Sequence, residues 1–241
     1  MPGKHPAKSS AQRTASGRVR SRGLLISLEG ADGAGKSTQH RLLVRYLRGR
    51  GRPVVATREP GGTPLGERVR RILLATRSKG IAPLAELALM YAARAQHLEQ
   101  VIRPALARGA LVVTDRFNDS SFAYQGCGRE LGFGTVRAFD NAICGDTQPD
   151  LTLLLDQPPN QSLGRAKGRE RAGSSVQARF ERQGIAFHER VRAGYLKLAR
   201  ANPGRIKIVN ANRPVREIQQ EIRAVVDGFL GARSEGRASG R

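Results

Sequence analysis

The stretch that decides the fold is Gly30-Ala31-Asp32-Gly33-Ala34-Gly35-Lys36-Ser37-Thr38. It matches the phosphate-binding loop pattern, in which a glycine is followed by four residues and then Gly-Lys-Ser. Glycines let the backbone wrap a phosphate group with its N–H groups pointing inward, and a helix that begins there adds its positive end. Lys36 can then reach the outer phosphates, and the Ser37 hydroxyl can bind a magnesium ion. We therefore predict that residues 30–38 bind a nucleoside triphosphate.

The residues on either side of this loop favour a functional site over a chance glycine-rich turn. The apolar run Leu24-Leu25-Ile26-Ser27-Leu28 leads into the loop as a strand. Apolar residues at three- and four-residue spacings, which predict a helix, lead out of it: Leu42, Leu43, Tyr46 and Leu47.

The rest of the chain repeats this alternation of strand and helix. Beyond the first strand, short apolar runs predict four more, at residues 53–57, 110–114, 150–156 and 206–210. Helical spacing covers residues 84–107, and a last helix is predicted over residues 214–230. The predicted fold is therefore α/β, a five-stranded parallel sheet of the P-loop NTPase type with helices on both faces.

Ligands of such sheets bind at the carboxyl ends of the strands. The residues that follow the five strands are therefore expected along one edge, and they are Gly30, Arg58, Asp115, Asp156 and Asn210. Residues 165–182 are rich in Arg, Gly, Ser and Gln and carry few apolar side chains. We expect this segment to be a mobile lid over the site rather than a piece of the core.

The 241 residues carry a net charge of +22, and part of this excess lies at the ends. Residues 1–22 hold six basic residues and no acidic one, so we expect a disordered basic tail there, a single P-loop domain over residues 23–230 and a second disordered tail at residues 231–241. A basic surface suits nucleotides or nucleic acid as partners. The basic segments lack interleaved aromatic residues that could stack on bases, so we expect at most weak nucleic-acid binding through the tails.

The two cysteines, Cys127 and Cys144, form neither a metal-binding pattern nor a disulfide framework, which fits a reducing compartment. No apolar stretch approaches the length of a membrane span. We expect a cytoplasmic protein, with an organelle transit peptide at residues 1–22 as the alternative.

Beyond the loop, several motifs in order resemble the thymidylate kinases, which phosphorylate thymidine monophosphate (dTMP). The resemblance spans about residues 25–230. Its further motifs are Thr57-Arg58-Glu59-Pro60-Gly61-Gly62-Thr63, Tyr91-Ala92-Ala93-Arg94, Asp115-Arg116 with Ser120 and Ala123-Tyr124-Gln125-Gly126, and Pro149-Asp150-Leu151-Thr152 through Asp156.

The resemblance implies transfer of a phosphoryl group from ATP, with Mg²⁺, to dTMP by a homodimer that pairs through helices near residues 84–107 and 132–144. It implies catalytic roles for Asp32, Lys36 and Arg58, and magnesium contacts for Ser37 and Asp115. An alternative for Asp115 is to orient Arg116. The implied dTMP-binding residues are Arg58, Met90, Arg94, Arg116, Ser120, Ser121, Tyr124 and Gln125. For Tyr124, an ordinary core position is the alternative to contact with the sugar.

Two positions depart from the family pattern. Met90 stands where the family usually stacks a phenylalanine on the thymine, and methionine defines the slot less rigidly. Gly33 stands where some members carry the catalytic arginine, so a lid arginine must supply that charge. Arg165 and Arg169 are the leading candidates, with Arg171 and Arg179 behind them.

Two other functions remain open on the sequence. The first is a kinase for another nucleoside monophosphate, which the change at Met90 suggests. The second is a nucleic-acid-binding protein that uses the phosphate loop as a switch, which the net charge of +22 suggests.

Overall fold

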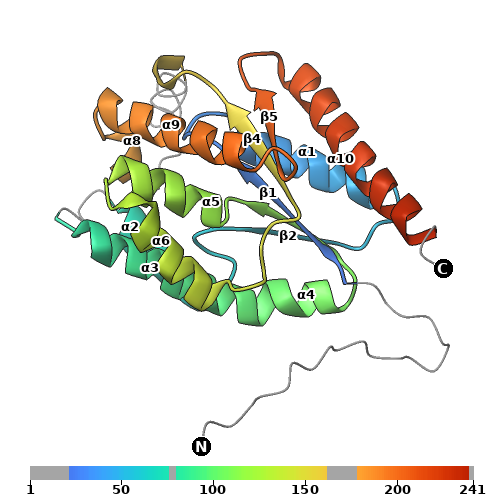
Figure 1. Ribbon diagram of the computed structural model, residues 1–241, viewed down its shortest axis with the longest axis horizontal. Coiled ribbons are helices and arrows are strands. Elements are labelled where there is room, and N and C mark those ends of the chain that lie inside the picture. The colour runs from blue at the N-terminus through green and yellow to red at the C-terminus, as the bar shows by residue number, and fades with distance from the viewer. Residues whose placement is uncertain (1–21, 76–79, 162–177, 239–241) are drawn as a thin grey trace, which may run out of the picture.

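The computed structural model describes residues 22–75, 80–161 and 178–238. Its centre is a five-stranded sheet in which every pair of neighbouring strands is parallel, with the order β2-β3-β1-β4-β5 (Figure 1). The strands are β1 Leu24–Glu29, β2 Val54–Arg58, β3 Leu111–Asp115, β4 Leu151–Asp156 and β5 Ile206–Asn210. The predicted fold class is confirmed, and each predicted strand is found within one residue at either end.

Alternate residues of the strands supply two separate cores. Leu25, Val112 and Leu154 belong to one buried cluster, while Ile26, Val113 and Leu153 belong to the other. Because neighbouring strand residues point to opposite faces, continuous apolar runs can bury both faces of the sheet. This explains why the strands read as unbroken hydrophobic stretches.

Helices cover each face of the sheet (Figure 1). One core includes residues of α1 Lys36–Gly49 and α10 Val215–Ala238. The other includes residues of the remaining longer helices, which are α2 Pro64–Leu74, α3 Pro83–His97, α6 Gly132–Ile143 and α9 Ile185–Ala201. Shorter helical segments are η1 Leu98–Ile102, α4 Arg103–Ala107, α5 Asn118–Ser121, η2 Phe122–Gly128 and α8 Ala178–Glu181.

The long helical stretch predicted over residues 84–107 is present as α3, η1 and α4 in direct succession. Its middle part, η1, is a π-helical segment, in which each turn takes one residue more than in an α-helix. Apolar spacing predicts a helix here but carries no signal for this change of winding.

The C-terminal helix requires a correction. We expected it to end near Leu230 and to give way to a tail at residue 231, whereas α10 continues to Ala238. The polar composition after Leu230 suggested the earlier end, but Ala, Arg and Glu are good helix formers, which allows the helix to continue. Of the predicted lid at residues 165–182, residues 162–177 lie outside the described part of the chain.

The register of the strands places the expected residues along one edge. Arg58 lies beside Asp115 across β2 and β3, and Leu28, just before the phosphate loop, lies on the other side of Asp115. Asp156 and Asn210 lie beside each other at the ends of β4 and β5. The sequence prediction of a common carboxyl edge is confirmed.

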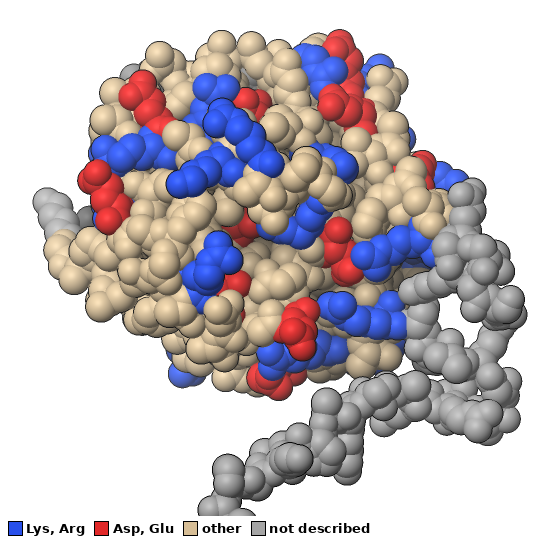
Figure 2. All heavy atoms as spheres, in the orientation of Figure 1, with Lys and Arg blue, Asp and Glu red and all other residues tan. Residues whose placement is uncertain are grey.

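Basic and acidic side chains are interspersed on the face in Figure 2 rather than segregated into one continuous basic band. Among the described residues, no helix combines the length and the apolar character that a membrane crossing requires.

Candidate active site

A cleft of about 820 Å³ opens at the carboxyl edge of the sheet. This volume lies at the upper end of the range for small-molecule pockets. Residues of the phosphate loop, of the ends of β2 and β3, of α3 and of η2 line it together. Of the residues predicted to bind ligands, it includes Asp32, Gly33, Gly35, Lys36, Ser37, Thr38, Arg58, Met90, Arg94, Asp115, Arg116, Ser120, Ser121, Tyr124 and Gln125.

The phosphate loop turns into α1 at Gly35, whose φ of 89° lies in the left-handed region that glycine adopts without strain. Lys36 is the first residue of the helix, and its Nζ donates to the carbonyl of Ala31 at 2.7 Å. Burial and the nearby Arg116 lower the pKa of Lys36 to about 8. Asp32, Asp115 and Glu29 oppose this shift but do not cancel it, so an anionic ligand would further favour the charged form of Lys36.

Ser37 and Asp115 meet at the floor of the cleft, where the Ser37 Oγ donates to Asp115 Oδ2 at 2.7 Å. A hydroxyl beside one carboxylate is a suitable partial shell for Mg²⁺, which usually takes its other ligands from water and phosphate. Within the described ranges, no group of three His, Cys, Asp or Glu side chains could hold a metal by itself. The residues thus fit a magnesium ion that arrives with a nucleotide.

Arg58 projects from the end of β2 and makes a forked contact with Glu67 of α2, with its NH2 group 3.0 and 3.1 Å from the two carboxylate oxygens. Both side chains are largely exposed, at 55% for Arg58 and 41% for Glu67. An exposed ion pair of this kind contributes little stability and exchanges partners easily. Arg58 is therefore free to turn toward an anion in the cleft.

Arg116 follows β3 with a φ of 73°, a strained backbone conformation for a residue that is not glycine. Its NH2 group donates to Asp32 Oδ1 at 2.6 Å and to the Tyr124 hydroxyl at 3.1 Å. Its NH1 group donates to the Gly30 carbonyl, Ser120 Oγ and Tyr195 hydroxyl. The arginine is held rigidly at the cleft wall.

Asp32 forms its ion pair with Arg116. Asp32 Oδ2 also accepts a hydrogen bond from the Tyr124 hydroxyl at 3.0 Å. Burial alone would raise the pKa of Asp32, but Arg116 and Lys36 lower it to about 2. The carboxylate therefore stays charged at neutral pH. Among the described contacts, the Arg116 guanidinium pairs with Asp32 and not with Asp115.

Glu29 is a buried carboxyl that the sequence reasoning missed. It ends β1, accepts from the Phe117 N–H at 2.7 Å, and accepts from the hydroxyls of Ser120 and Tyr195 at 2.5 and 2.9 Å. Burial and the neighbouring Asp119 raise the pKa of Glu29 to about 7 although Arg116 opposes them. Its place at the end of an apolar strand was the only sequence signal for it.

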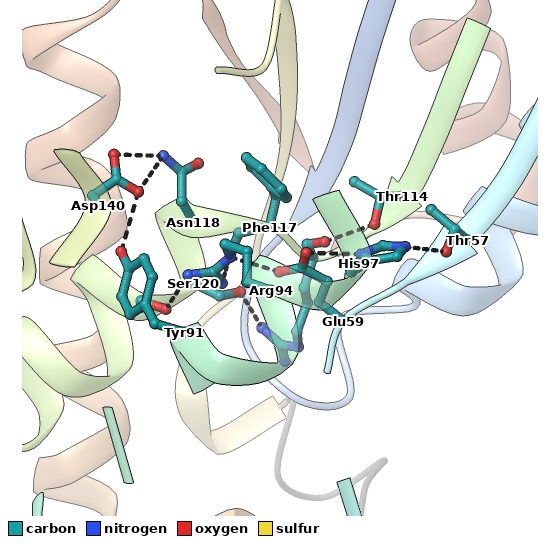
Figure 3. Close-up of polar contacts among 12 residues, drawn as sticks. Thr57, Glu59, Tyr91, Arg94, His97, Thr114, Phe117, Asn118, Ser120 and Asp140 are labelled. Atoms are coloured by element: carbon teal, nitrogen blue, oxygen red, sulfur yellow. Dashed lines mark hydrogen bonds and ion pairs between the residues drawn. The ribbon is translucent and has the colours of Figure 1, made fainter. Parts of the chain in front are cut away.

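Arg94 of α3 lines the cleft, and its side chain is almost completely buried. Figure 3 shows the polar side chains around it. Its Nε donates to Glu59 Oε2 at 2.7 Å, and its NH1 and NH2 groups donate to Ser121 Oγ and the Phe117 carbonyl, both at 3.1 Å. These bonds use three of the five N–H groups of a guanidinium. Among the described residues, no partner is found for the other two N–H groups, which are therefore available to a ligand.

Glu59 binds Arg94, and His97 in turn binds Glu59 (Figure 3). Glu59 Oε1 lies 2.9 Å from His97 Nδ1, and His97 Nε2 lies 2.6 Å from Thr57 Oγ1. Burial would raise the pKa of Glu59, but Arg94 and His97 lower it overall. Gly62, with a φ of 76°, packs so closely that a Cβ there would lie 2.6 Å from His97 Nε2. His97 is therefore a fully buried residue that supports the position of Glu59.

Met90 and Gln125 line the cleft beside Arg94, on α3 and η2 respectively. Tyr124 has the packing expected of a core aromatic, since its ring lies edge-on to Phe180 and Phe187, and its hydroxyl donates to Asp32 at the cleft. Gln125 donates through Nε2 to Glu86, another buried carboxylate that the sequence reasoning missed. Glu59 belongs to the motif at residues 57–63, but the sequence did not indicate that it pairs with Arg94.

Arg165, Arg169 and Arg171 lie outside the described residues. The remaining lid candidate, Arg179 of α8, contacts α2 and α3: its Nε donates to the Leu73 carbonyl at 2.5 Å, and its NH2 group pairs with Glu86.

Comparison with known proteins yields one consistent result. A family model described as thymidylate kinase matches residues 28–222. Thymidylate kinases of Pseudomonas entomophila and Methylococcus capsulatus are 49% and 50% identical over 208 residues, which is 86% of this chain and 97% of each relative. The crystal structure of thymidylate kinase from Ehrlichia chaffeensis superposes with a TM-score of 0.68 at 31% identity, covering 86% of this chain and 99% of that one.

Proposed function

This chain belongs to the thymidylate kinase family, and we propose how its cleft transfers a phosphoryl group from ATP to dTMP. The observation that carries the proposal is the set of residues that line a single cleft. Groups suited to phosphates line one part of it, and a buried hydrogen-bonding wall lines another. Such a transfer needs two anionic substrates held in line with cations where charge develops. Lys36, Arg58 and Arg116 line the same cleft, which supports a site that holds two anionic substrates beside cations.

The phosphate loop, residues 30–38, binds the triphosphate of ATP through its backbone N–H groups and Lys36. Arg58 and Arg116 bind the phosphate of dTMP, because planar guanidinium groups match phosphate oxygens with paired hydrogen bonds. Asp32 keeps Arg116 in place and, with Tyr124, faces the sugar of dTMP. The hydrogen bonds from Asp32 to Arg116 and Tyr124 support this arrangement.

Ser37 and Asp115 hold the magnesium ion that accompanies ATP. Their direct contact at 2.7 Å supports this assignment. A magnesium ion held there would supply positive charge beside the phosphates. Asp115 thus acts at the metal rather than as the residue that orients Arg116, since Arg116 is oriented by Asp32.

Arg94, Ser121 and Gln125 read the edge of the thymine, and Met90 covers its face. The rigid hold on Arg94 supports its role, because a donor fixed by Glu59 and Phe117 loses little freedom when a base arrives. Methionine covers the ring by dispersion and sulfur contact. Ser120 supports the site by its bond to Arg116.

Arg165 or Arg169 supplies the cation that Gly33 cannot provide in the phosphate loop. A lid that carries this charge would exclude water from the transferred group as it closes. Separate alanine substitutions at the two positions, assayed for kcat, would identify which one acts.

The enzyme works as a homodimer that pairs through α3 and α6. Sedimentation would show a mass near twice 26.1 kDa. The free thiols of Cys127 and Cys144 support a cytoplasmic location, where thiols stay reduced.

The test of the function is ADP release with ATP and Mg²⁺, with each nucleoside monophosphate offered separately. Turnover with dTMP and little with the purine monophosphates is expected. Equal turnover with several pyrimidine monophosphates would favour the broader kinase that Met90 suggests. Turnover without dependence on any acceptor would contradict the proposal.

A further inference from the structure

Glu86 lies in the first turn of α3, and its carboxylate is completely buried. Its Oε1 accepts from Gln125 Nε2 at 2.8 Å and from Arg129 Nε at 3.3 Å, and its Oε2 accepts from Arg129 NH2 at 3.1 Å and from Arg179 NH2. Burying a carboxylate is costly unless charged partners and hydrogen bonds compensate for the lost water. Four donors from three residues satisfy it here.

Glu86 shares one stripe of α3 with two residues of the cleft. Met90 and Arg94 follow it at four-residue intervals, and residues four apart lie on the same face of a helix. Met90, Arg94 and Gln125 all line the cleft, whereas Glu86 lies behind Gln125. The same face of α3 therefore carries Arg94, which can donate hydrogen bonds into the cleft, and Glu86, which binds the side chain of Gln125.

Glu86 dictates which end of the Gln125 amide faces the cleft. A carboxylate only accepts hydrogen bonds, so the NH₂ group of Gln125 must turn toward Glu86. The two arginines hold the carboxylate in place by ion pairs, so this orientation does not alternate. The carbonyl oxygen of Gln125, which accepts hydrogen bonds, is consequently the end left for a ligand.

A donor from Arg94 beside an acceptor from Gln125 matches one kind of pyrimidine edge. Thymine and uracil present a carbonyl oxygen that accepts and an N3–H that donates. Cytosine presents an amino group and an unprotonated N3, so both roles are reversed. A buried polar group that meets the wrong partner is left unpaired, and such a mismatch can discriminate by orders of magnitude.

We propose that Glu86 is a positioning residue for base selectivity, which it exerts by fixing the amide of Gln125 so that the enzyme accepts N3–H pyrimidines and rejects cytosine. The proposal rests on the proposed function, since it requires that Gln125 face the base of the acceptor. Glu86 itself does not touch the substrate.

The test is Glu86→Gln, assayed for kcat/KM with dTMP, dUMP and dCMP. An amide at position 86 can donate as well as accept, so Gln125 is no longer held in one orientation. We expect the dTMP/dCMP ratio to fall at least about tenfold, while the dTMP/dUMP ratio stays within about twofold because both bases share the same edge. Glu99→Gln, at an exposed position of η1, is the matched control and should change neither ratio.

A merely structural role for Glu86 would lower turnover with all three acceptors alike and would contradict the proposal. If Glu86→Gln does not fold, Gln125→Leu tests the same claim, because it removes the acceptor while Arg129 and Arg179 still pair with Glu86. Retained discrimination against dCMP in Gln125→Leu would overturn the proposal. Failure of the unaltered enzyme to turn over dTMP would instead contradict the proposed function, so the two failures are distinguishable.

Discussion

The phosphate side and the base side of the cleft are built in different ways. By the roles proposed above, we define the phosphate side as Lys36, Ser37, Arg58, Asp115 and Arg116, and the base side as Glu59, Glu86, Arg94, His97 and Gln125. On the phosphate side, Arg58 and its partner Glu67 are 55% and 41% exposed. On the base side, Arg94 and its partner Glu59 are 3% and 5% exposed. One pair is adjustable, and the other is fixed.

The difference follows from what each side must recognise. Phosphates carry charge that the loop and guanidinium groups can follow as it moves during transfer, so partial freedom is useful there. A base differs from its competitors only by the direction of a few hydrogen bonds, so its readers must not reorient. Buried carboxylates supply that rigidity, since an unpaired charge in the interior is strongly disfavoured.

The largest effect should come from Lys36→Ala on the phosphate side. Removal of the cation that contacts the triphosphate should lower kcat by about 10³-fold, as for other groups that stabilise charge in a transition state. The KM for dTMP should change little because the base side is intact. Steady-state kinetics would measure both, and a fall in kcat below tenfold would remove Lys36 from catalysis.

Glu59→Gln should lower the free energy of unfolding and raise the KM for dTMP. It removes the charge that pairs with buried Arg94, and such a change costs about 3–5 kcal/mol in the free energy of unfolding. The KM for dTMP should rise by about tenfold or more, since Arg94 loses its fixed position. Urea unfolding and steady-state kinetics would measure the two effects.

Glu67→Gln is the matched control for Glu59→Gln, because the same substitution then affects the exposed partner of Arg58. The free energy of unfolding should change by less than about 1 kcal/mol. Equal losses of stability at positions 59 and 67 would contradict the contrast between the two sides.

Glu29 lies where the two sides meet, behind Arg116, and it should make stability depend on pH. Its pKa is about 7 in the folded protein and near 4.5 when unfolded. Between these values the folded state holds a proton that the unfolded state has lost, so the free energy of unfolding falls as pH rises. The loss should approach about 3 kcal/mol above pH 7. Urea unfolding from pH 5 to 8 should show this slope, and Glu29→Gln should remove it.

Lys36 predicts a smaller pH effect on activity. Its pKa of about 8 in the free enzyme means that the charged form declines above that pH. The kcat/KM for ATP should therefore fall about fourfold from pH 7 to 8.5. The same decline in kcat should appear at higher pH, because bound phosphates favour the charged lysine. A flat kcat/KM over this range would show that Lys36 stays fully charged.

The fold was predictable because its signals are local and repeated. Apolar runs marked all five strands, and the edge that they form followed from their parallel order. The end of α10 was not predictable, because the residues after Leu230 suit a helix and a polar tail equally well. Winding changes such as η1 leave no trace in apolar spacing.

The phosphate side and the base side also differed in how far the sequence predicted them. The phosphate side could be predicted from one contiguous motif and the residues that end two strands. The base side depends on pairs far apart in the sequence, such as Glu59 with His97 and Glu86 with Arg129. A single sequence shows that these residues are charged, but it does not show which charge will be buried against which.

The central claim is that the phosphate side sets the rate and the base side sets the choice of acceptor. The most direct measurement compares kcat/KM for dTMP and dCMP in Arg58→Ala and in Arg94→Leu. We predict that Arg58→Ala lowers both values by a similar factor, while Arg94→Leu lowers the value for dTMP alone and so reduces the ratio by at least about tenfold. An equal change of the ratio in both variants would contradict the claim.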